Sequence, residues 1–173
     1  FKQRYAGQIQ LLFVVDNESV PVAPIIREAL ARNPNRPNFT AEMLTVKEKR
    51  GIWGKMDALV TGHAHAKGDL ILWSDSDAIV GPDYVEQMAA SFQNPETHVV
   101  TTPQYEVNPT NFATALKVAG NYADIAVYGI GVESLQKNKG VGWGHSLAFR
   151  RADYESHRSE IEEKLLRTFA DDQ

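Results

Sequence analysis

Residues 67–84 read Lys-Gly-Asp-Leu-Ile-Leu-Trp-Ser-Asp-Ser-Asp-Ala-Ile-Val-Gly-Pro-Asp-Tyr. Within them, residues 70–73 form an unbroken apolar run after a Gly-Asp turn, which is typical of a strand buried on both faces of an α/β sheet. Asp75 and Asp77 follow at the carboxyl end of that strand, where open α/β sheets bind their ligands. Two carboxylates there can share Mg²⁺ or Mn²⁺, a hard cation that usually brings substrate phosphates with it. The alternative is a polar turn in which one aspartate caps a backbone amide.

Strand and helix patterns alternate around this stretch. Pro82 predicts a helix over residues 82–92, because proline is favoured in a first helical turn. Apolar runs predict further strands, and periodic apolar stripes predict helices after Pro24 and after Gly54. The strands are expected at residues 9–15, 41–46, 98–102 and 147–149. This alternation argues for an α/β domain with a largely parallel central sheet flanked by helices.

The pattern changes in the last third of the chain. Residues 111–135 read as a helix that is apolar around much of its circumference, so we expect it to be buried rather than to lie against a membrane interface. A glycine-rich loop with Trp143, Gly144 and His145 follows, and a charged helix is expected at residues 159–168.

Composition limits the classes of function. The chain has 173 residues, 43% hydrophobic and 23% charged, which fits one soluble globular domain. Its net charge of −4 argues against nucleic acid as a partner. The chain has no cysteine, which excludes disulfides and thiolate metal sites. It begins at Phe1 and stops after an acidic pair, so we interpret it as a piece of a longer protein.

Five short motifs occur in an order that resembles one family, the ceramide glucosyltransferase-like proteins within the broad glycosyltransferase family 2. They are Val14-Val15-Asp16-Asn17-Glu18-Ser19, Gly54-Lys55-Met56-Asp57, Leu72-Trp73-Ser74-Asp75-Ser76-Asp77, Gly144-His145-Ser146-Leu147-Ala148-Phe149-Arg150-Arg151 and Ala170-Asp171-Asp172. The resemblance covers nearly the whole chain. It implies a single catalytic domain of the GT-A (nucleotide-diphospho-sugar transferase) fold over residues 1–173.

The resemblance also implies a function. The protein would transfer a hexose or N-acetylhexosamine from a UDP-sugar to a lipid hydroxyl, with inversion and with Mg²⁺ or Mn²⁺. The family's first strand, its Gln-x-x-Arg-Trp motif and its membrane helices would lie outside this chain. The full-length protein would then work at the cytoplasmic face of a membrane, to which the absent segments attach it, whereas this piece is expected to be soluble.

Each implied role falls on a residue of a suitable chemical type. Asp16 would hold the base or ribose, Lys55 would lie near the diphosphate, Asp75 would place the nucleotide, and Asp77 would bind the metal together with Asp75. Asp172 would be the general base that takes the proton of the acceptor hydroxyl, with Asp171 beside it. An aromatic side chain beside glycines can form a mobile lid, so Trp143, Gly144 and His145 are expected to contact the acceptor; the alternative is a buried Trp143 with a neighbouring His145 whose hydrogen bonds are satisfied.

Two other classes of function remain open. A phosphatase of the haloacid dehalogenase type would use Asp75 as nucleophile and Asp77 as acid/base, although Ile79 replaces the usual Thr or Val of that motif. The third possibility is a domain that binds a nucleotide sugar without catalysing transfer.

Overall fold

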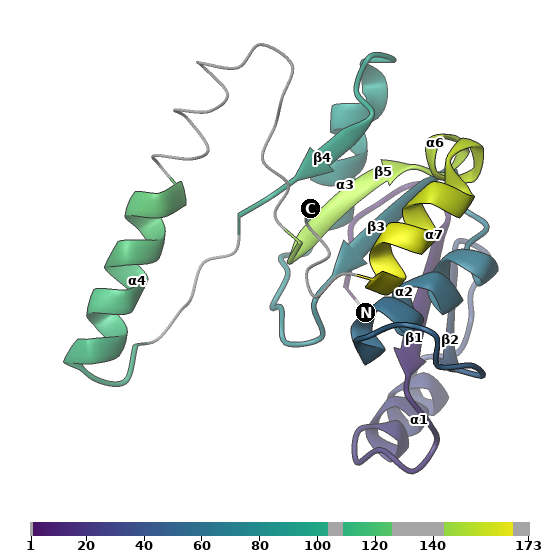
Figure 1. Cartoon of the computed structure of the whole chain (residues 1–173), viewed down its shortest axis with the longest axis horizontal. Coiled ribbons are helices and arrows are strands. Elements are labelled where there is room, and N and C mark those ends of the chain that lie inside the picture. Colours follow the sequence, from purple (N-terminus) through teal and green to yellow (C-terminus); the bar gives the residue numbers. More distant parts are fainter. Residues whose placement is uncertain (1, 104–108, 126–143, 168–173) are drawn as a thin grey trace. The chain divides into compact units, whose positions relative to one another are not determined.

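The computed structural model describes residues 2–103, 109–125 and 144–167 (Figure 1). The chain divides into two compact units. The first unit comprises Phe1–Ile71, Val80–His98 and Phe149–Asp171, and the second comprises Leu72–Ile79, Val99–Ala148 and Asp172–Gln173.

A parallel pair of strands lies at the centre of the first unit. Strand β1 (Ile9–Val15) pairs with β2 (Phe39–Thr45) in a register that runs from Ile9 opposite Phe39 to Val15 opposite Thr45. The amide of Val46 continues the ladder by donating to the Val15 carbonyl at 3.0 Å. The carboxyl ends of both strands are therefore fixed side by side, and the loops that follow them start from the same edge.

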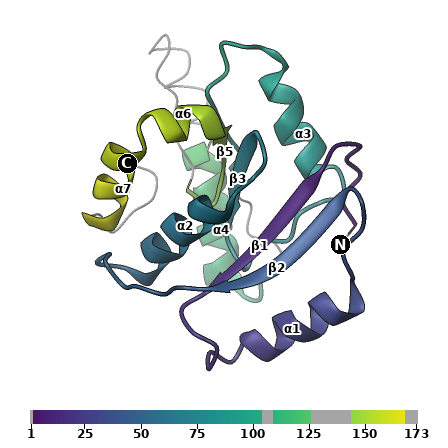
Figure 2. The ribbon, with the colours of Figure 1, turned by 90° about the vertical axis from the view of Figure 1, so that its right-hand side faces the viewer.

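Helices pack against this pair on both sides. Helix α1 (Ala23–Arg32) contacts β2, and α2 (Gly54–His65) contacts β1, as Figure 2 shows. Both helices bury apolar side chains at helical spacing, with Ala23 and Ile26 on α1 and Met56 and Val60 on α2, although Ile25 of α1 is 64% exposed. Burial of these stripes against the sheet orients the amino end of α2 relative to the end of β1.

The far side of α2 carries a histidine in an aromatic cluster. His63 is buried, and its ring centroid lies 4.1 Å from that of Tyr154 and 5.8 Å from that of Phe149. Tyr154 belongs to α6 (Arg151–Ser156), and its hydroxyl donates to Glu162 on α7 (Arg158–Arg167) at 2.8 Å. The cluster joins the three helices, and the sequence patterns did not indicate α6.

The remaining strands form a second sheet in the order β3-β5-β4. Their bounds are Leu70–Ser74 for β3, Ser146–Arg150 for β5 and Val99–Thr101 for β4. The division between the two units passes within β3 and within β5. All five predicted strands exist, and β1 has the predicted bounds.

Strand direction corrects one expectation. Backbone amides donate across β3 and β5 from Asp75 to His145 at 3.2 Å and from Arg151 to Asp69 at 2.8 Å. The residue numbers rise along one strand as those of their partners fall along the other, which is the pattern of an antiparallel pair. The fold is α/β with a small parallel sheet, and the predicted mostly parallel arrangement holds for β1 and β2 but not for β3 and β5.

Two predicted helices also differ from the structure. Helix α3 (Tyr84–Ala90) begins two residues after Pro82 and continues into a short 3-10 turn, η1 (Ser91–Gln93). Helix α4 (Phe112–Ile125) starts close to the predicted position, but its expected burial is wrong for the described residues, because Phe112 is 84% and Leu116 64% exposed. Among the described residues, no helix is both long and apolar enough to cross a bilayer.

Candidate functional site

Asp75 and Asp77 lie in one tight turn at the end of β3. Asp75 directly follows the strand, and its carbonyl accepts the amide of Ala78 at 3.2 Å, which closes a four-residue turn from Asp75 to Ala78. The Asp77 side chain is exposed within this turn, whereas that of Asp75 is half-buried. The strand and the turn therefore present two carboxylates from one short piece of backbone, as the sequence predicts.

His145 lies directly across from Asp75. The Nδ1 atom of His145 is 2.7 Å from Oδ2 of Asp75, and the two residues are also joined through their backbones at 3.2 Å. His145 immediately precedes β5, so this double link extends the β3–β5 pairing by one residue. The structure thus brings together two predicted site residues that are 70 positions apart in the sequence.

Asp16 forms a second corner, within the first unit. It directly follows β1, and Nζ of Lys49 lies 3.2 Å from its Oδ2 atom. A Cβ added at Gly54 would lie 3.1 Å from Oδ1 and 3.3 Å from Oδ2 of Asp16, so the carboxylate packs against the first residue of α2. The Asp16 carboxylate therefore lies beside both the lysine ammonium and the partial positive charge of a helix amino end.

A buried carboxylate holds the loop beside Asp16. Asp57, in the first turn of α2, is only 3% exposed, and its Oδ1 accepts the backbone amides of Arg50 at 2.9 Å and Gly51 at 2.8 Å. The amide of Ile52 donates to the Leu166 carbonyl at 3.0 Å, which ties the same loop to α7. Residues 47–53 are therefore held at several points and carry Lys49 to Asp16.

The remaining predicted residues are only partly described. Lys55 is exposed in the first turn of α2, one residue after Gly54. Trp143, Asp171 and Asp172 lie outside the described residues, so the proposed general base and part of the proposed acceptor loop stay predictions.

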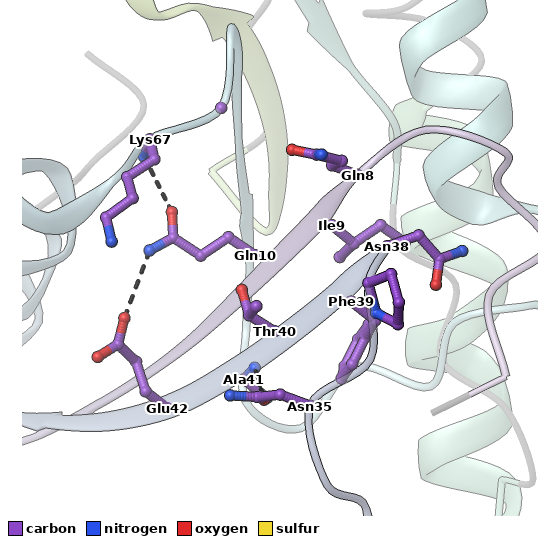
Figure 3. A pocket seen from close by; sticks show the side chains of 12 residues that line it. Gln8, Ile9, Gln10, Asn35, Asn38, Phe39, Thr40, Ala41, Glu42 and Lys67 are labelled. Atoms are coloured by element: carbon purple, nitrogen blue, oxygen red, sulfur yellow. Dashed lines mark hydrogen bonds between the residues drawn. The ribbon is translucent and has the colours of Figure 1, made fainter.

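A pocket of about 400 Å³ opens elsewhere in the first unit, among residues at the amino ends of β1 and β2 (Figure 3). Its polar wall centres on Gln10, whose Nε2 donates to Glu42 at 3.4 Å and whose Oε1 accepts the amide of Lys67 at 2.8 Å. Asp16 follows the opposite end of β1. Of the predicted site residues that the structure describes, none lines this pocket.

The acidic turn offers oxygen ligands of the kind that Mg²⁺ and Mn²⁺ prefer. The described parts of the chain contain no group of three or more histidine, aspartate or glutamate side chains arranged to hold a metal. Two carboxylates nevertheless fit a magnesium-type ion, which commonly takes one or two protein carboxylates and completes its shell with water and substrate phosphates.

Comparison with known proteins places the chain in a family. The family model of glycosyl transferase family 21 matches residues 1–172. The chain belongs to glycosyl transferase family 21. This is the ceramide glucosyltransferase family, so the resemblance inferred from the five motifs is confirmed.

A curated relative of this family 21 chain is also named as a glycosyltransferase. An N-acetylglucosaminyltransferase from Rhizobium leguminosarum bv. viciae is 31% identical over 94 residues, which cover 54% of this chain and 20% of the relative. The family 21 chain thus spans about a fifth of the length of that relative. No solved structure matches the chain.

Sequence reasoning missed three contributors to the Asp16 corner. The sequence patterns assigned Lys49 to no site and gave no structural role to Gly54 or Asp57. An acid in the first turn of a helix, directly after a glycine-containing loop, is the signal that would have indicated Asp57, because such a carboxylate can accept amides that precede the helix.

Proposed function

We propose that this chain is part of a metal-dependent GT-A glycosyltransferase that transfers a hexose or N-acetylhexosamine from a UDP-sugar to a lipid hydroxyl. The observation that carries the proposal is the Asp75–Asp77 turn at a strand end in a chain that family 21 matches over residues 1–172. Membership of the ceramide glucosyltransferase family supports a lipid acceptor, and the name of the Rhizobium relative supports an N-acetylhexosamine as one donor sugar.

The acidic turn would bind the diphosphate end of the donor. Asp77, being exposed, and Asp75 would hold Mg²⁺ or Mn²⁺ against the diphosphate. When bound, the cation stabilises the negative charge that grows on the leaving diphosphate. Lys55 would add a positive charge near the same group.

The Asp16 corner would bind the nucleoside. A carboxylate accepts hydrogen bonds from hydroxyl and N–H groups, which ribose and uracil both offer. The Asp16 side chain is 42% exposed and is flanked by Lys49 and the amino end of α2, so it is accessible to such donors. The acceptor hydroxyl would lose its proton to Asp172, with Asp171 beside it, and attack from the opposite face would invert the anomeric carbon.

Replacing Asp77 with alanine should abolish the dependence of UDP binding on Mn²⁺. In calorimetric titrations of UDP, we expect Mn²⁺ to tighten binding to the wild type, and we expect Asp77→Ala to weaken binding in Mn²⁺ at least about tenfold by removing a metal ligand. The matched control is Asp69→Ala, which removes an exposed acid just before the same strand and should leave binding unchanged.

Two outcomes would count against the proposed function. If wild type binds UDP equally well with and without Mn²⁺, the acidic turn is not a metal site. If the protein ignores UDP and hydrolyses a generic phosphomonoester such as p-nitrophenyl phosphate in a reaction that needs Asp75, the haloacid-dehalogenase-type alternative is favoured instead.

Replacing Gly54 with alanine should weaken UDP binding without destabilising the fold. The added methyl group would lie 3.1 Å from the nearer carboxylate oxygen of Asp16 and would push that carboxylate away. We expect the Kd for UDP to rise about tenfold, because small misplacements in a binding site have large effects. The midpoint of chemical denaturation should stay level or rise, because alanine favours the helix.

The control for Gly54→Ala lies on the same helix. A Cβ at Gly62 would meet Val14 at 3.6 Å, an ordinary contact, so Gly62→Ala should not change UDP affinity. Equal affinity of wild type and Gly54→Ala would show that Asp16 does not contact the nucleotide.

A further inference from the structure

We propose that His145 is a positioning residue that fixes the carboxylate of Asp75 for the metal–diphosphate end of the donor, an inference that rests on the proposed function. The glycine-rich loop pattern predicted a contact between His145 and the acceptor. The structure instead joins its imidazole to Asp75, with 2.7 Å between Nδ1 and Oδ2.

Hydrogen bonds within the second sheet hold the backbone next to His145 in place. The next residue, Ser146, is 8% exposed, and its carbonyl accepts the amide of Thr102 at 3.2 Å and the hydroxyl of Thr101 at 2.9 Å. The hydroxyl of Thr102 also donates to Oγ of Ser146 at 2.8 Å. Three hydrogen bonds from the end of β4 therefore hold the residue beside His145, so the imidazole is carried by ordered backbone.

The two links between His145 and Asp75 reinforce each other. The backbone bond at 3.2 Å sets the two residues opposite each other, which is the arrangement in which side chains of antiparallel strands meet on one face. The side-chain bond then fixes the torsion of the carboxylate. A hydrogen bond to a charged group is also stronger than one between neutral groups.

The carboxylate also selects one form of the imidazole. An ionised aspartate accepts hydrogen bonds only, so the neutral ring must place its proton on Nδ1 to donate to Oδ2. Partners of this kind orient metal-ligating side chains in many proteins, and their loss typically weakens metal binding about 10- to 100-fold. The backbone carbonyl of Asp75 accepts the amide of Ala78 and so begins the turn that carries Asp77, which means that an ordered Asp75 also orders the neighbouring ligand.

The test compares two substitutions of His145. His145→Ala removes the donor, whereas His145→Asn keeps an N–H donor close to the position of Nδ1. We expect His145→Ala to raise the calorimetric Kd for UDP in Mn²⁺ about 10-fold or more, and His145→Asn to stay within about threefold of wild type. His65→Ala, which changes an exposed histidine on α2, serves as control and should bind as wild type does.

Kinetic constants separate the two roles of His145. A positioning residue at the donor end raises the KM for the sugar nucleotide and leaves the KM for the acceptor unchanged. A rise in the KM for the acceptor alone, or a Kd for UDP in Mn²⁺ that His145→Ala leaves unchanged, overturns the inference while the proposed function stands. Failure of wild type itself to bind UDP in Mn²⁺ overturns both.

A spectroscopic measurement needs no ligand. Long-range ¹H–¹⁵N NMR spectra at pH 8 should show His145 with its proton on Nδ1 in the wild type, and Asp75→Ala should remove that preference. A proton on Nε2 in the wild type overturns the inference, because Nδ1 could then not donate to the carboxylate.

Discussion

Replacing Asp57 with alanine is expected to lower the free energy of unfolding by about 3 kcal/mol, since each hydrogen bond to a charged group contributes roughly 1.5–3 kcal/mol. The carboxylate is 3% exposed and accepts two backbone amides, those of Arg50 and Gly51. Alanine would leave both amides without this acceptor and would open a small cavity beneath the loop. The measurement is chemical denaturation followed by circular dichroism.

Asparagine at this position provides the matched control. Asp57→Asn keeps an oxygen that can accept one or both amides but loses the charge, so about 1 kcal/mol should be lost. Because the same loop carries Lys49 to Asp16, Asp57→Ala should also weaken UDP binding under conditions where it stays folded. A denaturation midpoint equal to that of wild type would show that the loop is held by its other contacts.

Lowering the pH from 7.5 to 5 should lower the free energy of unfolding by about 2 kcal/mol through His63 alone. Burial lowers the pKa of His63 to about 4, the negative charge of Glu162 raises it in part, and the positive charge of Arg158 lowers it further. In the unfolded chain the pKa returns to its ordinary value of 6.5. Between these values the unfolded chain binds a proton that the folded chain does not, so stability falls as the pH falls.

The variant His63→Leu isolates this contribution. The difference in unfolding free energy between wild type and His63→Leu should change by about 2 kcal/mol between pH 7.5 and pH 5, in favour of the variant at the lower pH. Carboxylates that titrate at low pH cancel in this comparison. His65→Gln, an exposed change two residues along α2, should run parallel to wild type. Parallel curves for wild type and His63→Leu would contradict a depressed pKa.

Local pattern predicted most of the secondary structure. The apolar run of residues 9–15 predicted the bounds of β1, because a buried strand can be recognised from its local sequence alone. Helix α3 began later than predicted because the residues after Pro82 form a turn before the helix. The exposure of α4 could not be predicted from its sequence. Apolar residues around a helix show that it can be buried, but they do not show which other element packs against it.

The candidate site was predicted by residue type but not by contact. Asp16, Asp75 and Asp77 follow apolar runs that predict strands, so the sequence alone locates them. The bond between Asp75 and His145 joins positions 70 residues apart, and it depends on an antiparallel pairing that the alternation of strands and helices did not indicate. The contact between Lys49 and Asp16 could not be predicted for a similar reason. It depends on the parallel register of β1 and β2, which places the start of the Lys49 loop beside Asp16.

Tyr154, whose ring packs against that of His63, limits the stability of the first unit at high pH. Burial, reinforced by the hydrogen bond to Glu162, raises the pKa of the Tyr154 phenol above its ordinary value of 10.0. The unfolded chain releases that proton at a lower pH than the folded chain, so stability is lost as the pH rises past the ordinary value. The same pair of rings therefore makes the first unit less stable at both low and high pH. Protonation of His63 is unfavourable in the folded chain, and so is ionisation of Tyr154.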